Sequence, residues 1–223
     1  MSGKYPHQSN YVYCSNNPLK VIDPNGEDEW ELARDGTLTF KKVNKDNDIV
    51  YATTSEGGII SKVFPVNTIN KNKGSYKFKQ EFEDENGKKH MESCTTEYMG
   101  FSDLDVGYSF FEFAVENTSV EWAISSSDKE VRVGTTGKEI FVKMPMVSNE
   151  KESYHSHNEK HSDESFISKP DRDAAKELIP KGVSIGVYMS GEKQYYMFEK
   201  VTFPNGTYYD YFGSKKAARS KNY

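Results

Sequence analysis

The alternation of apolar and polar residues predicts strands over much of the first half of the chain. Residues 76–82 alternate in the way expected of a half-buried strand. An Asp-Gly pair at 35–36 lies between two short apolar-rich runs, a pattern typical of a β-hairpin. The pattern weakens only over 55–74, where we expect a loop. The region 30–97 is therefore predicted to be mainly β-structure.

Two helices are predicted C-terminal to this β-rich region. The first begins in a capping box at 102–105 and ends near Asn117, with its aromatic residues facing the core. The second fits 170–178, because a proline and a glycine follow it closely. Short strands are predicted around these helices at 120–124, 131–133, 140–144, 183–189, 194–201 and 207–212.

This succession of elements predicts an α+β fold, with a mixed β-sheet and flanking helices. A length of 223 residues allows one good domain with an appended segment. Only 35% of the residues are hydrophobic, but 15 Tyr, 13 Phe and 2 Trp can still build a core. We expect three parts: an N-terminal segment 1–26, a β-rich part 27–100 and a part with both helices, 101–223.

Charge and composition disfavour several classes of function. There are 29 Lys and Arg residues against 34 Asp and Glu, a net charge of −5, and phosphate binding depends on cations. No segment approaches the roughly 20 apolar residues needed to cross a bilayer. The N-terminus also lacks the apolar run of a secretory signal peptide. Cys14 and Cys94 form no CxxC pair, so we interpret them as free thiols.

The candidate chemistry lies in a histidine pair followed by the start of a helix. His155 and His157 are two residues apart, so on an extended segment both imidazoles can reach one ion. Asp171 opens the second predicted helix, where it also completes a capping box with Ser168. Hydrolytic zinc sites use three such ligands and leave a fourth position for water. The sequence thus predicts Zn²⁺ at His155, His157 and Asp171, with an exposed histidine-rich loop as the alternative.

A hydrolytic zinc site also needs a base to accept a proton from the attacking water. The spacing is not H-E-x-x-H, so the base must come from elsewhere in the chain. Glu121 is the strongest candidate because it lies within an apolar strand, where a carboxylate needs a partner. A solvent-facing position in that strand is the alternative. The other candidates are Glu112, Glu116, Glu139 and Glu152.

These residues resemble the signature of the JAMM (JAB/MPN) metalloprotease family. That signature is a distant strand glutamate, then His-x-His-Pro, then Ser-x-x-Asp, and the chain has Glu121, His155-Ser156-His157 and Ser168-Lys169-Pro170-Asp171 in that order. The resemblance implies a JAMM/MPN-like, cytidine-deaminase-like core and a β-rich N-terminal extension. It also implies the roles of the matching residues: His155, His157 and Asp171 bind zinc, Glu121 is the general acid/base, and Ser168 holds the water or the developing oxyanion.

The sequence departs from that signature in two places. Asn158 stands where the family has a proline. Ten residues, 158–167, separate the histidine pair from Ser168, which is longer than the usual interval, so this loop must bulge. His161 lies in the bulge and could be a further ligand.

The N-terminal segment resembles the C-terminal end of the Rhs/YD-repeat core. The family motifs Ser-Pro-Tyr-x-Tyr, Asn-Asn-Pro and Asp-Pro-x-Gly correspond to 9–13, 16–18 and 23–26, with Asn10 in place of the first proline. In that family a variable toxin follows the last motif, and JAMM-like domains occur among these toxins. The resemblance implies a bacterial effector that an Rhs carrier or secretion system delivers into the cytoplasm of a target cell.

The expected function is therefore that of an interbacterial toxin with zinc metallopeptidase activity. It would cleave peptide or isopeptide bonds in a protein substrate, and a cognate immunity protein would be its second partner. No nucleic-acid or membrane partner is expected. The two alternatives are a metal-dependent nuclease toxin, for which His157-Asn158 could form part of the site, and a non-enzymatic binding module.

Overall fold

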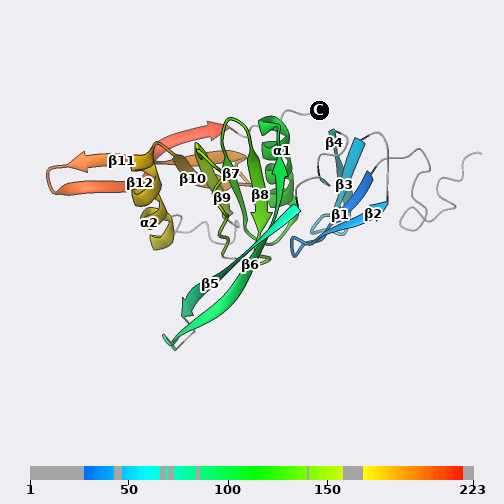
Figure 1. Ribbon diagram of the computed structural model, residues 1–223, viewed down its shortest axis with the longest axis horizontal. Coiled ribbons are helices and arrows are strands. Elements are labelled where there is room, and N and C mark those ends of the chain that lie inside the picture. The colour runs from blue at the N-terminus through cyan, green and yellow to red at the C-terminus, as the bar shows by residue number, and fades with distance from the viewer. Residues whose placement is uncertain are drawn as a thin grey trace, which may run out of the picture.

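The computed structural model describes residues 28–42, 47–65, 69, 73–83, 86–139, 141–157 and 168–217. Within these residues the chain folds into a four-stranded sheet and an eight-stranded sheet with two α-helices (Figure 1). The predicted α+β class, a mixed sheet with flanking helices, is confirmed. The Rhs-like motifs, Cys14, Asn158 and His161 lie outside the described residues. Cys94 is a buried free thiol, as expected.

The smaller sheet comes from the N-terminal part of the chain and has the strand order β2-β1-β3-β4. Its strands β1 and β3 are parallel, and the expected Asp-Gly hairpin joins β1 to β2, with Gly36 at a positive φ of 82°. The prediction of a loop over 55–74 is wrong, because residues 59–65 form an edge strand that pairs with β3. The strands are β1 Asp28–Leu32, β2 Leu38–Lys42, β3 Asn47–Thr53 and β4 Ile59–Pro65.

The larger sheet has the order β12-β11-β10-β9-β7-β8-β6-β5, and β9 and β10 are its parallel pair. The larger sheet includes β5 and β6, so it extends across residue 100, where we expected one part of the chain to end. The division of the chain into three parts stays a prediction. The two hairpins β5–β6 and β11–β12 extend away from its body (Figure 1). The strands are β5 Lys73–Glu83, β6 Lys89–Phe101, β7 Trp122–Ser126, β8 Val131–Thr135, β9 Glu152–His157, β10 Ser184–Met189, β11 Gln194–Phe203 and β12 Gly206–Ala217.

One expected strand, at 140–144, is not formed by the described residues 141–144. These residues do not join a strand ladder, and two threonine side chains bond to two of their carbonyl groups. Thr96 of β6 donates to the carbonyl of Lys143, and Thr136 donates to that of Phe141. Side-chain bonds of this kind are not visible in an apolar–polar pattern, so the pattern alone suggested a strand.

Helix α1, Leu104–Asn117, lies between the two sheets and contributes seven of the 24 buried residues of the main core. Asp103 caps it by accepting a hydrogen bond from the Val106 N–H, so the expected capping box starts one residue too early. Gly107 allows close packing, since a Cβ atom there would lie 2.8 Å from Val131. The expected inward residues are all buried: Phe110, Phe111, Phe113 and Ala114.

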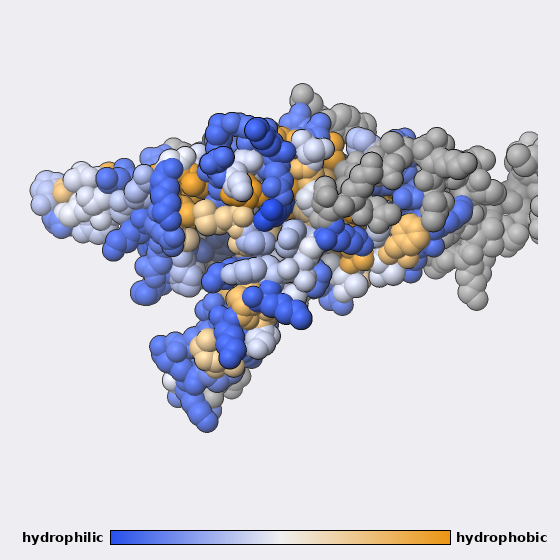
Figure 2. All heavy atoms as spheres, in the orientation of Figure 1, coloured by the Kyte–Doolittle hydropathy of each residue, from blue (hydrophilic) through white to orange (hydrophobic). Residues whose placement is uncertain are grey.

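Helix α2, Lys169–Leu178, covers the opposite face of the larger sheet and continues into a short 3-10 turn, Ile179–Lys181. Neighbouring residues of β10 show the two faces. Tyr188 belongs to the core under α1, while Val187 and Met189 pack in a second cluster with α2. Figure 2 shows a largely hydrophilic surface on both projecting hairpins. Neither described helix is long and apolar enough to span a bilayer.

The contact between α1 and the two sheets gives a stability prediction. Phe110 is fully buried, with its ring centroid 5.7 Å from that of Phe64 in β4 and 6.0 Å from that of Trp122 in β7. Phe110→Ala is expected to lower the free energy of unfolding by about 3–5 kcal/mol, because it leaves a cavity where both sheets meet the helix. Chemical denaturation measures this loss. The control Phe212→Ala removes a partly exposed ring and should cost less than about 1 kcal/mol.

Candidate metal centre

Strand β9 directs the two histidines of the candidate site toward the face covered by α2. His155 pairs with Val187 of β10 and with Ala123 of β7, while His157 pairs with Met189. The intervening Ser156 is buried on the α1 side. The two-residue spacing therefore places both imidazoles on one face, as the sequence predicts.

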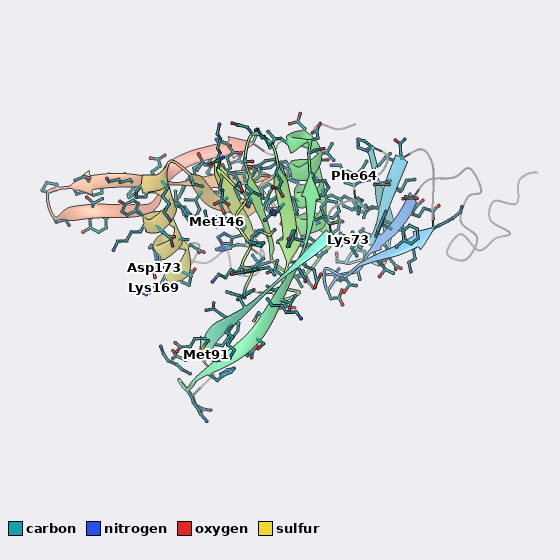
Figure 3. All side chains as sticks on the ribbon, viewed as in Figure 1. Phe64, Lys73, Met91, Met146, Lys169 and Asp173 are labelled. Atoms are coloured by element: carbon teal, nitrogen blue, oxygen red, sulfur yellow. The ribbon has the colours of Figure 1, made fainter. Side chains whose placement is uncertain are left out.

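The third residue, Asp171, is fixed by the start of α2. The Ser168 backbone N–H and hydroxyl both donate to Asp171 Oδ2 at 2.7 Å, and the Asp171 N–H lies 3.4 Å from the Ser168 hydroxyl. The expected capping box at this helix start is confirmed. Lys169 and Asp173, one helical turn apart near the start of α2, form an exposed ion pair (Figure 3), whereas Asp171 is buried. The cap thus presents a buried carboxylate to the histidines.

The three side chains converge at distances that suit a metal ion. His155 Nε2 lies 2.9 Å from His157 Nε2 and 3.1 Å from Asp171 Oδ1, and His157 Nε2 lies 3.6 Å from Asp171 Oδ2. Two ligand atoms bonded to one tetrahedral zinc ion are about 3.3 Å apart, given bonds of about 2.0–2.1 Å. The residues present therefore fit such an ion, and this group could hold a metal.

Burial and charge act in opposite directions on the ionisable groups of this site. Burial alone would lower the pKa of His155, but the carboxylates of Asp171 and Glu121 raise it above its ordinary value. Burial alone would raise the pKa of Asp171, but the hydrogen bonds from His155 and Ser168, with the nearby histidine charges, hold it well below its usual range. The site thus favours an anionic Asp171, which is the charge state that a carboxylate ligand needs.

Glu121 lies immediately before β7 and is brought to the same group. Its neighbour Trp122 faces α1, and the next residue, Ala123, pairs with His155, so alternation places Glu121 on the histidine face. Burial raises the pKa of Glu121 to about 7, which the charge of His155 opposes and that of Asp171 reinforces. Glu121 therefore lies on the same face as the histidines and interacts electrostatically with His155 and Asp171.

The other candidate bases lie elsewhere in the fold. Glu112 accepts a hydrogen bond from Tyr195 at 2.8 Å, and Glu116 one from Tyr188 at 3.2 Å, both on the α1 side of the sheet. Glu152 accepts a hydrogen bond from Tyr108 of α1 at 2.6 Å. Glu139 is exposed. Among the candidate glutamates, Glu121 is therefore the one whose pKa is shifted by the charges of the histidine group.

The structure also shows features of the site that the sequence did not reveal. The Ser168 hydroxyl donates to Asp171, so its observed contact orients a ligand, while its role toward water or an oxyanion stays a prediction. Two buried hydroxyl groups, of Thr135 and Ser156, hold the backbone next to Glu121. A small polar residue at a buried strand position was the available signal for these contacts.

Comparison with known proteins gives no relative for this chain: no family model, no curated protein and no solved structure matches it. The case for a metal centre therefore rests on the site itself. That case consists of three convergent ligand atoms, a cap that fixes one of them, and a nearby carboxylate with a raised pKa.

Proposed function

We propose that the chain is a zinc-dependent hydrolase with a JAMM/MPN-like core, which cleaves peptide or isopeptide bonds. The observation that supports this most strongly is the convergence of His155, His157 and Asp171. Glu121 lies on the same face and interacts electrostatically with two of them. Three ligands of the His/carboxylate type with a separate acidic group are the parts that hydrolytic zinc sites need. They come from β9, from the start of α2 and from the residue before β7.

In this proposal each site residue has a defined role. A zinc ion held by His155, His157 and Asp171 would supply Lewis-acid chemistry, activating a water molecule and polarising a carbonyl group. Glu121, with a pKa of about 7, accepts a proton from the attacking water and returns it to the leaving amine nitrogen. The Ser168 backbone N–H orients Asp171, and the Ser168 hydroxyl is the candidate donor to the developing oxyanion.

The proposed substrate is a protein, and the proposed setting is interbacterial competition. The net charge of −5 favours a protein substrate over a nucleic acid. The three Rhs-like motifs at 9–26 support delivery by an Rhs carrier or secretion system into the cytoplasm of a target cell. An effector of this kind needs a cognate immunity protein in the producing cell, which is the second proposed partner.

The test of the proposed function is direct detection of cleavage. Zinc-loaded protein is incubated with a bacterial lysate, and new peptide N-termini or cleaved isopeptide linkages are identified by mass spectrometry. We expect products that appear with the loaded protein and disappear when a chelator removes the metal. Degradation of added RNA or DNA without new protein termini would favour the nuclease alternative, and the absence of both products would favour a binding module.

A further inference from the structure

The peptide group that joins Glu121 to Trp122 is held in an unusual way. Strand β7 lies between β9 and β8, so the peptide groups of a regular strand there would bond to backbone groups on both sides. The β7–β9 ladder has its last rung at Ala123 and His155. The peptide between Glu121 and Trp122 is the next one along, and side chains take the place of backbone partners at both of its ends.

Two buried hydroxyl groups make these contacts. The Trp122 N–H donates to Ser156 Oγ of β9 at 2.9 Å, and the Thr135 hydroxyl of β8 donates to the Glu121 carbonyl at 2.6 Å. The orientation of the Thr135 hydroxyl is fixed in turn, because it accepts the Gly137 N–H at 3.0 Å. Both ends of one peptide group are thus bonded to side chains, one from each neighbouring strand.

The two sides of this peptide group differ in what they carry. Trp122 is anchored, since its ring is buried in the core and its Nε1 donates to Thr118 Oγ1 at 2.8 Å. On the other side, Glu121 belongs to no strand, although its own N–H donates to the Lys138 carbonyl at 2.9 Å. A rotation of the peptide would therefore displace Glu121 rather than Trp122.

From this geometry we infer that Ser156 and Thr135 are positioning residues, whose hydroxyl groups clamp the Glu121–Trp122 peptide and so aim the Glu121 carboxylate at the metal centre. The inference rests on the proposed hydrolase function for its kinetic consequence. Ser156 lies between the two candidate ligands, so its hydroxyl ties the strand that carries them to the residue that moves the proton. The ligand set and the base are then held in one fixed relation, which proton transfer requires.

Loss of either hydroxyl leaves a buried peptide group without its partner. A buried N–H or carbonyl that has lost its partner turns toward another one, and a shift of about 1 Å in a catalytic group can cost about 100-fold in rate. The imidazoles lie on the opposite face of β9 from Ser156 and do not depend on this bond. The predicted defect is therefore in proton transfer and not in metal binding.

The experiment uses the full chain loaded with zinc and two matched pairs of variants. Ser156→Ala and Thr135→Val remove a hydroxyl, while Ser156→Thr and Thr135→Ser retain it. We expect Ser156→Ala and Thr135→Val to lower kcat by about 10–100-fold, with KM and the zinc Kd within about threefold of wild type. Ser156→Thr and Thr135→Ser, which retain the hydroxyl, should stay within about threefold of the wild-type kcat. The control Thr39→Val, at an exposed position of β2, should change nothing.

A second readout does not depend on activity. Hydrogen exchange of the Trp122 amide, measured by NMR, should be at least about tenfold faster in Ser156→Ala and near normal in Ser156→Thr. A wild-type kcat in both Ser156→Ala and Thr135→Val overturns the inference, as does a zinc Kd that weakens in parallel with kcat. If Ser156→Ala does not fold, Thr135→Val decides the kinetic question.

These readouts separate the inference from the proposed function. If the zinc-loaded wild type cleaves nothing, the proposed function fails, and amide exchange alone then decides whether the clamp exists. Unchanged Trp122 exchange in Ser156→Ala would overturn the clamp, while faster exchange would support it as a device that holds Glu121.

Discussion

Replacing Glu121 with glutamine is expected to leave zinc binding intact and to lower kcat by about 10²–10⁴-fold, the usual contribution of a general acid or base. Glutamine keeps the size and hydrogen-bonding shape of the side chain but cannot accept a proton near neutral pH. Glu121 belongs to no strand and is held through its backbone, so the substitution should not disturb the fold. Zinc content, kcat and KM of the purified variant measure the two halves of this prediction.

The same variant also tests the proposed toxicity. In a bacterial cytoplasm, wild-type protein should arrest growth while Glu121→Gln should not, provided that both accumulate to the same level. The control is Glu177→Gln, which alters an exposed carboxylate on α2 that pairs with Lys181. Full activity of Glu121→Gln would remove this residue from the mechanism. Loss of zinc together with activity would instead assign Glu121 to the metal.

Local sequence patterns predicted those elements of the fold whose stability depends on their own residues. The strand around 76–82 has strict alternation, and the aromatic residues of α1 repeat at helical spacing, so both were predicted correctly. Strand β4 was missed because it is an edge strand with apolar residues such as Ile59 and Val63 exposed. Its existence depends on pairing with β3, and no short window of sequence contains that pairing.

The candidate site likewise has residues that local sequence could place and residues whose position depends on strand pairing. His155 and His157 are two residues apart, and Asp171 closes a capping box, so local rules alone placed the three side chains. Glu121 was chosen among five glutamates because it lies in an apolar run and matches the JAMM signature. Its place beside the histidines depends on register, because Ala123 pairs with His155. The hydroxyls of Thr135 and Ser156 depend on the same register and have no motif of their own.

Removing one proposed ligand should abolish tight zinc binding. We expect one zinc ion per chain in the wild type and a Kd at least about 100-fold weaker in His155→Ala, since the loss of outer-shell contacts alone costs about 10–100-fold. Asp171→Asn should weaken binding in the same way. Asparagine can still accept hydrogen bonds within the capping box, so this variant removes charge while α2 keeps its cap. Isothermal titration with zinc measures each Kd.

Weaker zinc binding should also reduce the stabilisation of the folded state by zinc. Free zinc at about 100 times the Kd stabilises the folded state by about 2.7 kcal/mol, which corresponds to about 5–10 °C in Tm for a chain of this size. Wild-type protein should show this shift, while His155→Ala should show almost none at the same zinc concentration. His90→Ala is the matched control, because His90 is exposed on the β5–β6 hairpin and pairs with Glu92. If His155→Ala bound zinc as tightly as wild type, the metal would lie elsewhere in the chain.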